Sequence, residues 1–235
     1  MRTHVPSKDA AWRRFAKRMV GSRGLWNLRL ARFKPNANHA IVKDPVGWYF
    51  AKYLHDEFEA EIVIIVKHPI SLFASYRRLD WHHTFHRVLR QPHVMNLLPP
   101  DIASRLSCSH DFVDAIALHW LVIYTSLRNM LGEHSRVTVR TIESLSNDPL
   151  NQYQSFCETL SIPWTKGRER LVQRRCLSGG AAEAKKTRLQ DLTRRSAEIF
   201  EHRVRSVSAE DRKRIHQLTW PIAKEYYNED SFRLE

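Results

Sequence analysis

A lysine and a serine eight positions apart are the residues of this chain best placed to bind a phosphate. Lys67 directly follows an apolar run, residues 62–66, that predicts a short buried strand. Pro69 suits the first turn of a helix over residues 71–79, which carries Ser75. A helix N-terminus offers N–H groups and a positive dipole end to an anion, and Lys67 would add a full charge. Two interpretations stay open on these local grounds: a phosphate site, and an ordinary strand–helix unit with a solvated lysine.

The same spacing resembles the 3′-phosphate-binding motif of sulfotransferases that use 3′-phosphoadenosine 5′-phosphosulfate (PAPS). In that family a basic residue, usually arginine, is followed by proline two positions on and by serine eight positions on. Lys67 departs from the usual arginine, because it keeps the charge but lacks the bidentate fork. Residues 78–81, Arg-Leu-Asp-Trp, are also similar to a bacterial branch of the family. The resemblance implies that Lys67 and Ser75 bind the 3′-phosphate of PAPS.

A second strand–helix corner is expected at Lys43. Residues 39–42 predict a strand, and apolar residues at helical spacing predict a helix over residues 46–58. Together with the strand at 62–66, these elements would form a compact βαβ unit. We therefore expect residues 41–43 and 62–67 to be adjacent parallel strands, with Lys43 and Lys67 at the same edge of the sheet.

The Lys43-Asp44-Pro45 corner is similar to one in tyrosylprotein sulfotransferases and related enzymes. The resemblance implies that Lys43 is the catalytic cation, which contacts the sulfuryl group during transfer. A structural ion pair with Asp44 or another neighbour is the alternative.

Later segments carry the resemblance further. Residues 137–142 predict a strand, and Asp148-Pro149 predicts the start of a helix. Between them Glu143-Ser144-Leu145 is similar to a turn of the family, and the resemblance gives this segment a role in supporting the fold. Residues 111–131 are apolar almost all round, which predicts a buried central helix with Trp120 in the core.

A basic loop near the C-terminus resembles one that folds over the nucleotide in this branch of the family. It covers residues 178–187 and precedes Arg194-Arg195-Ser196, which is similar to an Arg-x-Ser turn. The resemblance implies that Arg194 and Ser196 bind the co-substrate, and a solvated charged linker is the alternative. A capping box, Ser208 with Asp211, then predicts the start of the last helix.

Composition limits the protein's class and partners. A chain of 235 residues can form one domain with a sizeable core, which we place at residues 39–235 after a basic helical segment at 1–38. The net charge of +13 suits polyanionic partners. Three unpatterned cysteines indicate a reducing, cytoplasmic location and no metal site. No stretch is apolar enough to predict a membrane span, and no helix-turn-helix, zinc finger or RNP motif indicates nucleic acid.

The usual Lys/Arg-Ser-Gly-Thr loop of sulfotransferases, which binds the 5′-phosphosulfate, has no good match here. Gly21-Ser22-Arg23-Gly24 has a similar composition but no apolar strand before it. We therefore interpret the chain as α/β, with a short parallel sheet flanked by helices, in an N-terminally truncated, P-loop-NTPase-like sulfotransferase fold. The expected function is sulfuryl transfer from PAPS, without a metal, to a hydroxyl or amine of a carbohydrate, small molecule or peptide. We expect weak or no activity, and the alternatives are a vestigial nucleotide-binding module or a basic, nucleic-acid-binding module.

Overall fold

The structure of the protein is a computed structural model that describes residues 41–43, 47–108, 110–132, 136–178 and 196–233. The chain divides into two compact units, Met1–Pro45 and Val46–Glu235. The described part of the first unit is residues 41–43, which are irregular and exposed. The expected boundary after residue 38 and the glycine-containing segment at 21–24 lie outside the described residues.

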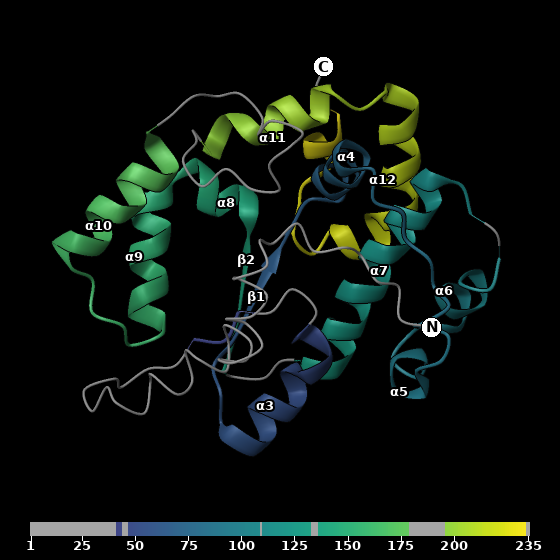
Figure 1. The fold of residues 1–235 in the computed structure, drawn as a ribbon, viewed down its shortest axis with the longest axis horizontal. Coiled ribbons are helices and arrows are strands. Elements are labelled where there is room, and N and C mark those ends of the chain that lie inside the picture. The colour runs from purple at the N-terminus through teal and green to yellow at the C-terminus, as the bar shows by residue number, and fades with distance from the viewer. Residues whose placement is uncertain (1–40, 44–46, 109, 133–135, 179–195, 234–235) are drawn as a thin grey trace, which may run out of the picture. The chain divides into compact units, whose positions relative to one another are not determined.

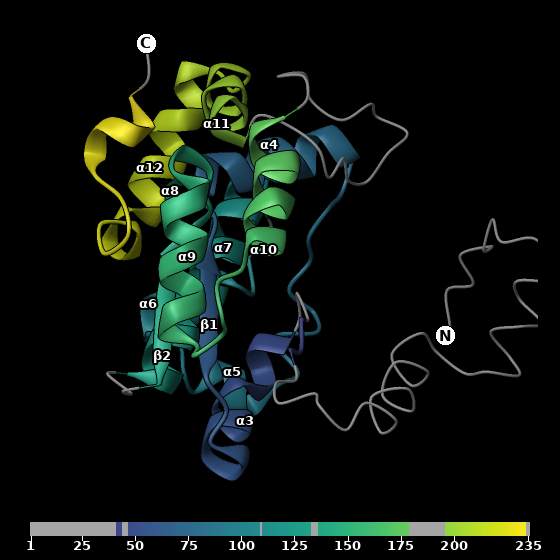
Figure 2. The same ribbon diagram turned by 90° about the vertical axis from the view of Figure 1, so that its left-hand side faces the viewer.

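The second unit is an α/β arrangement that is mostly helical (Figures 1 and 2). Its described strands form one short, parallel, two-stranded sheet. In chain order its elements are η1 (Gly47–Phe50), α3 (Ala51–Phe58), β1 (Ile62–Val66), α4 (Pro69–Leu79), α5 (Pro92–Met95), α6 (Pro100–Arg105), α7 (Phe112–Leu131), β2 (Val137–Thr141), α8 (Ile142–Asn147), α9 (Pro149–Thr159), α10 (Lys166–Val172), the π-helical η2 (Gln173–Leu177), α11 (Ser196–Arg205), α12 (Ala209–Ala223) and η3 (Glu229–Phe232).

The sheet pairs β1 with β2 in parallel, from Ile62 opposite Val137 to Val66 opposite Thr141. β-Branched residues dominate both strands, and such side chains pack well on a pleated surface. Both strands were predicted from their sequence patterns. The long crossover between them includes α7, as a parallel connection requires.

The expected strand beside β1 is wrong for its described residues. Residues 41–43 are irregular, and Ile41 and Val42 are 80% and 78% exposed, so Lys43 does not end a strand. The parallel neighbour of β1 is β2 instead. The physical reason is the length of the pairing segment. β2 has five residues that pair along the whole of β1, whereas Ile41 and Val42 are the only β-branched residues directly before Lys43.

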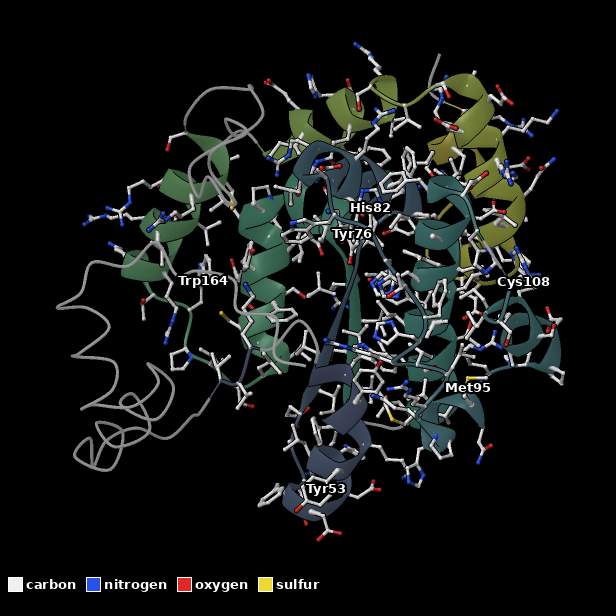
Figure 3. All side chains as sticks on the ribbon, turned by 45° about the vertical axis from the view of Figure 1, so that its right-hand side comes forward. Tyr53, Tyr76, His82, Met95, Cys108 and Trp164 are labelled. Atoms are coloured by element: carbon white, nitrogen blue, oxygen red, sulfur yellow. The ribbon has the colours of Figure 1, made fainter. Side chains whose placement is uncertain are left out.

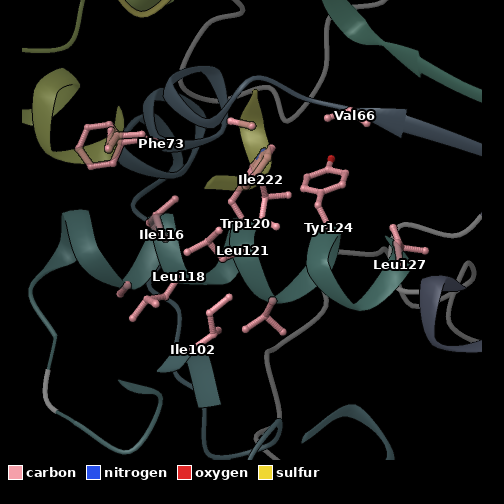
Figure 4. Packing of buried hydrophobic residues seen from close by; sticks show 14 of the residues in the cluster. Val66, Phe73, Ile102, Ile116, Leu118, Trp120, Leu121, Tyr124, Leu127 and Ile222 are labelled. Carbon is pink, nitrogen blue, oxygen red and sulfur yellow. The ribbon is translucent and has the colours of Figure 1, made fainter. Parts of the chain in front are cut away.

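The core lies around α7, which supplies the largest share of the buried side chains (Figure 4). The Asp111 side chain caps this helix by accepting the N–H of Asp114. α4 and α12 both pack against α7, and Trp120 is completely buried there. The predicted central helix is therefore confirmed, with its core tryptophan.

Helix starts follow the local signals of the sequence. Pro69 and Pro149 occupy the first turns of α4 and α9, and the Ser208 hydroxyl caps α12 by accepting the N–H of Asp211. Glu143, expected in a turn, lies instead in the short helix α8, which the Thr141 hydroxyl caps. No helix in the described part of the chain combines the length and apolarity needed to cross a membrane.

Candidate functional site

Lys67 and Ser75 meet at the corner where β1 gives way to α4. The ammonium group of Lys67 donates a hydrogen bond to Ser75 Oγ at 2.7 Å. Ser75 Oγ in turn donates to the carbonyl oxygen of Ser71 at 2.9 Å, one helical turn back. The structure thus brings the two residues together, as their spacing predicts. Their binding of a phosphate stays a prediction.

The backbone of Lys67 is fixed from α7. The indole N–H of Trp120 donates to the Lys67 carbonyl oxygen at 2.7 Å, and the Lys67 N–H donates to the Tyr124 hydroxyl at 3.1 Å. Trp120 and Tyr124 are one turn apart on α7, so both side chains project toward the end of β1 near Val66 (Figure 4). Burial raises the pKa of Tyr124 to about 12, so its hydroxyl stays protonated and donates to the carbonyl of Ile65. These hydrogen bonds therefore hold the main chain of Lys67 in place at the end of β1.

His68 is a fully buried, neutral ring at the same corner. Its Nδ1 accepts the N–H of Ile70 at 3.3 Å and caps α4, so the ring proton resides on Nε2. That nitrogen lies 3.1 Å from Ser231 Oγ, whose own proton goes to the Asn228 carbonyl. Burial, reinforced by nearby His216, lowers the pKa of His68 to about 3. This histidine adds no charge to the site near neutral pH.

A partly buried carboxylate, Glu143, lies at the matching end of β2. Its Oε1 accepts the backbone N–H of His68 at 3.3 Å, and its Oε2 accepts the hydroxyl of Tyr227 at 2.8 Å. Burial raises the pKa of Glu143, and the bonds from Tyr227 and His68 and the charge of Lys67 oppose that rise. The pKa of Tyr227 is raised by its burial and by the nearby carboxylate.

Sequence reasoning missed Glu143 as a site residue. The signal was present, because Glu143 follows a predicted strand just as Lys67 does. The carboxyl ends of parallel strands share one edge of a sheet. What the sequence did not show was that these two strands are neighbours.

The N-terminus of α4 uses several of its N–H groups within the protein. His68 donates to Glu143, Ile70 donates to the His68 ring, and Pro69 has no N–H. Leu72 donates to the His68 carbonyl as part of the helix. An anion at this corner would therefore depend on the Lys67 ammonium and the Ser75 hydroxyl more than on the helix N-terminus.

The remaining predicted site residues are placed less fully. Ser196 begins α11, a helix that packs against α4 and α8, but its side chain is outside the described residues. Arg194 and most of the basic loop, residues 179–195, are also outside them. Lys43 belongs to the first unit, where it is exposed, and the two described residues before it are irregular. The strand-end argument for a catalytic Lys43 is thereby lost, and its role rests on the family resemblance alone.

A cavity of about 610 Å³ lies elsewhere, over the sheet between α7 and α9. Its lining is largely apolar, with Ile64, Leu127 and Val139, and it includes Arg128, which is paired with Glu225 at 2.5 Å. Lys67 and Ser75 do not line it. We place the site at the corner, because the charge of Lys67, the hydroxyl of Ser75 and the partly buried carboxylate of Glu143 all belong to it.

Other candidate chemistry finds no support in the described residues. They contain no group of histidine, cysteine or acidic side chains able to hold a metal ion. The three cysteines are free thiols. The half-buried His119 hydrogen-bonds with the hydroxyl of Tyr76 (labelled in Figure 3) at 3.1 Å.

Comparison of the chain with protein-family models, curated proteins and solved structures gives no match. Interpretation of the site therefore rests on the motifs and on the geometry of the corner.

Proposed function

We propose that the chain binds the 3′-phosphate of an adenine nucleotide through Lys67 and Ser75, and that it is related by fold and function to PAPS-dependent sulfotransferases. The observation that carries the proposal is the 2.7 Å contact between the Lys67 ammonium and the Ser75 hydroxyl, at the carboxyl edge of a parallel sheet. Ligands of open α/β sheets bind at that edge. The spacing of the two residues adds the family resemblance.

The corner suits a phosphate for a physical reason. Trp120 and Tyr124 hold the Lys67 backbone, so little of its main-chain freedom is lost when an anion binds. A phosphate oxygen between the two side chains would accept one N–H from the ammonium. The Ser75 hydroxyl would donate to the phosphate after turning away from the Ser71 carbonyl. Such charge-assisted bonds are the strong class of hydrogen bonds.

The proposed reaction is an in-line displacement at sulfur. An acceptor hydroxyl or amine attacks the sulfur and loses a proton, while the bond from sulfur to the bridging oxygen of the 5′-phosphate breaks. Cations stabilise the negative charge that develops on that oxygen. The family resemblance gives this role to Lys43, and the general base is unassigned.

Nucleotide binding without efficient transfer is the second candidate. Two observations favour it: no Lys/Arg-Ser-Gly-Thr motif occurs in the 235 residues, and α4 spends N–H groups on His68 and Glu143. Loss of a single preorganised donor to a developing oxyanion typically slows a reaction by about 10² to 10³. We expect weak or no turnover of PAPS with phenolic, sugar and amine acceptors, and rapid turnover would reject the second candidate.

Calorimetric titration with adenosine 3′,5′-bisphosphate tests the binding site. Lys67→Ala removes a charge-assisted contact and should weaken binding by about 1.5–3 kcal/mol. Lys213→Ala, on an exposed face of α12, is the matched control and should bind like the wild type. Lys67→Arg should bind at least as tightly, because it restores the bidentate fork. Equal affinity of folded Lys67→Ala and wild type would reject the assignment.

A further inference from the structure

Glu143 sets a negative charge beside a site proposed for an anion. Its carboxylate is partly buried and accepts the N–H of His68 at the corner, yet the proposed reaction gives it no part. An ionised carboxylate at this place would repel a phosphate dianion, because like charges repel more strongly where the surroundings are partly shielded from water. The charge of Glu143 must therefore change, or be compensated, when a phosphate binds.

In the described part of the chain, the groups around Glu143 come from four elements or segments. The end of β1 presents Lys67 and the His68 N–H, the segment after α12 presents the Tyr227 hydroxyl, and α7 presents Tyr124. The His68 ring is neutral near pH 7, since its pKa is lowered to about 3. α11, which packs against α8, carries Glu198, Glu201, His202, Arg203 and Arg205. The charge of Lys67 lowers the pKa of the Glu143 carboxyl.

We infer that Glu143 couples anion binding to proton uptake: the carboxylate is protonated when a dianion binds between Lys67 and Ser75. This inference rests on the proposed phosphate site. No covalent bond breaks in the step, and the proton comes from solvent.

The sign of the coupling follows from electrostatics. Burial already raises the pKa of Glu143, and Lys67 holds it down. A bound dianion would occupy Lys67 and add negative charge, so both effects would raise the pKa further. By linkage, the ligand must bind more tightly to the protonated protein, and affinity must increase as pH falls.

Glu143→Gln mimics the protonated carboxyl and is the main test. The readout is the dissociation constant of adenosine 3′,5′-bisphosphate for the variant and the wild type between about pH 5 and pH 8.5. If the ligand raises the pKa of Glu143 by one unit, the wild type should bind about tenfold more weakly than Glu143→Gln at the high-pH end. The two constants should converge as pH falls. The ligand's own titration cancels in this ratio.

Tyr227→Phe is a second variant with a directional outcome. It removes the hydroxyl that stabilises the ionised carboxylate, so the pKa of Glu143 should rise. The pH at which the affinity for the ligand changes should therefore be higher in the variant than in the wild type. A purely structural role of Tyr227 would lower stability without moving that pH. An unmoved transition in the folded variant would count against the inference.

Calorimetry of the wild type with inorganic sulfate gives an independent measure. Sulfate stays a dianion throughout this pH range, so any proton taken up belongs to the protein. Titrations in buffers of different ionisation enthalpy should show a net uptake of a fraction of a proton for the wild type and none for Glu143→Gln.

If the wild type binds and Lys67→Ala does not, but Glu143→Gln shows the same pH dependence as wild type, the inference fails and the phosphate site stands. If the wild type binds neither ligand at any pH, both fail.

Discussion

Single hydrogen bonds decide how the Lys67 side chain is presented. The lysine contributes the charge, but its direction depends on the Trp120 indole and the Tyr124 hydroxyl, which hold the main chain on both sides of its Cα atom. Both partners are buried, so these bonds are shielded from competing water. At this scale the site is a half-buried lysine and a buried serine held by a buried support.

Replacement of Trp120 by phenylalanine tests this support. Trp120→Phe keeps an aromatic ring but removes the indole N–H that donates to the partly buried carbonyl of Lys67. Such a loss costs about 1–3 kcal/mol of unfolding free energy. Urea denaturation would measure it, and the matched control is Trp164→Phe in the half-buried connection between α9 and α10 (Figure 3). Equal losses for the two variants would show that the indole bond does not matter.

At the scale of elements, the segment of residues 227–232 packs against the corner. Tyr227 reaches Glu143, Ser231 reaches the His68 ring, and Phe232 packs on that ring with their centroids 4.3 Å apart. Phe232 is only 4% exposed although it belongs to a four-residue 3₁₀ helix, η3. A short element with weak intrinsic stability is thus held by its side-chain contacts.

Truncation of that aromatic anchor should destabilise the second unit. Phe232→Ala removes a buried ring, a change that typically costs about 3–5 kcal/mol. Phe58→Ala is the matched control, because Phe58 ends α3 with 66% of its surface exposed and should change stability by less than about 1 kcal/mol. Comparable urea midpoints for the two variants would contradict the anchoring role of η3.

Local patterns predicted the elements better than their pairing. The residues of β1 and β2, the proline at the start of α4 and the apolar length of α7 each specify their element within a few positions. Whether β1 lies beside residues 41–43 or beside β2 depends on contacts across the crossover, which no local pattern contains. The Lys67–Ser75 pair was predictable because strand end and helix lie in one continuous stretch. Glu143 and Tyr227 were not, because the fold brings them from distant segments.

At the scale of the molecule, several histidine rings of the second unit are neutral near pH 7 because their pKa values are lowered. His83 stacks on His119 with ring centroids 3.7 Å apart, and burial, with each ring's neighbouring histidine, lowers their pKa values to about 4 and about 3. His68, also lowered to about 3, lies at the corner. In the unfolded chain these rings would titrate near their ordinary pKa of about 6.5.

The protein should therefore lose stability in mild acid. Because the pKa of each folded ring is depressed, its contribution is fully present above about pH 6.5 and is lost as pH falls below that value, by up to about 1.4 kcal/mol per pH unit and histidine. The raised pKa of Glu143 works in the opposite direction, but it is one group against three. Urea denaturation between about pH 8 and pH 5 would measure the slope. His119→Gln should flatten it, and His93→Gln, at an exposed position of α5, should not.

The distance in sequence between the partners of the corner has a consequence for how the protein is made. His68 meets Ser231, 163 positions further along the chain, and Tyr227 closes on Glu143 and Val66 from the same late segment. During synthesis, β1 and α4 emerge long before these partners are made, so the His68 ring and the Glu143 carboxylate are exposed to solvent in the meantime. Contacts of such long sequence separation slow folding. A nascent chain from which residues 227–232 have not yet emerged should thus present an open, chaperone-accessible corner.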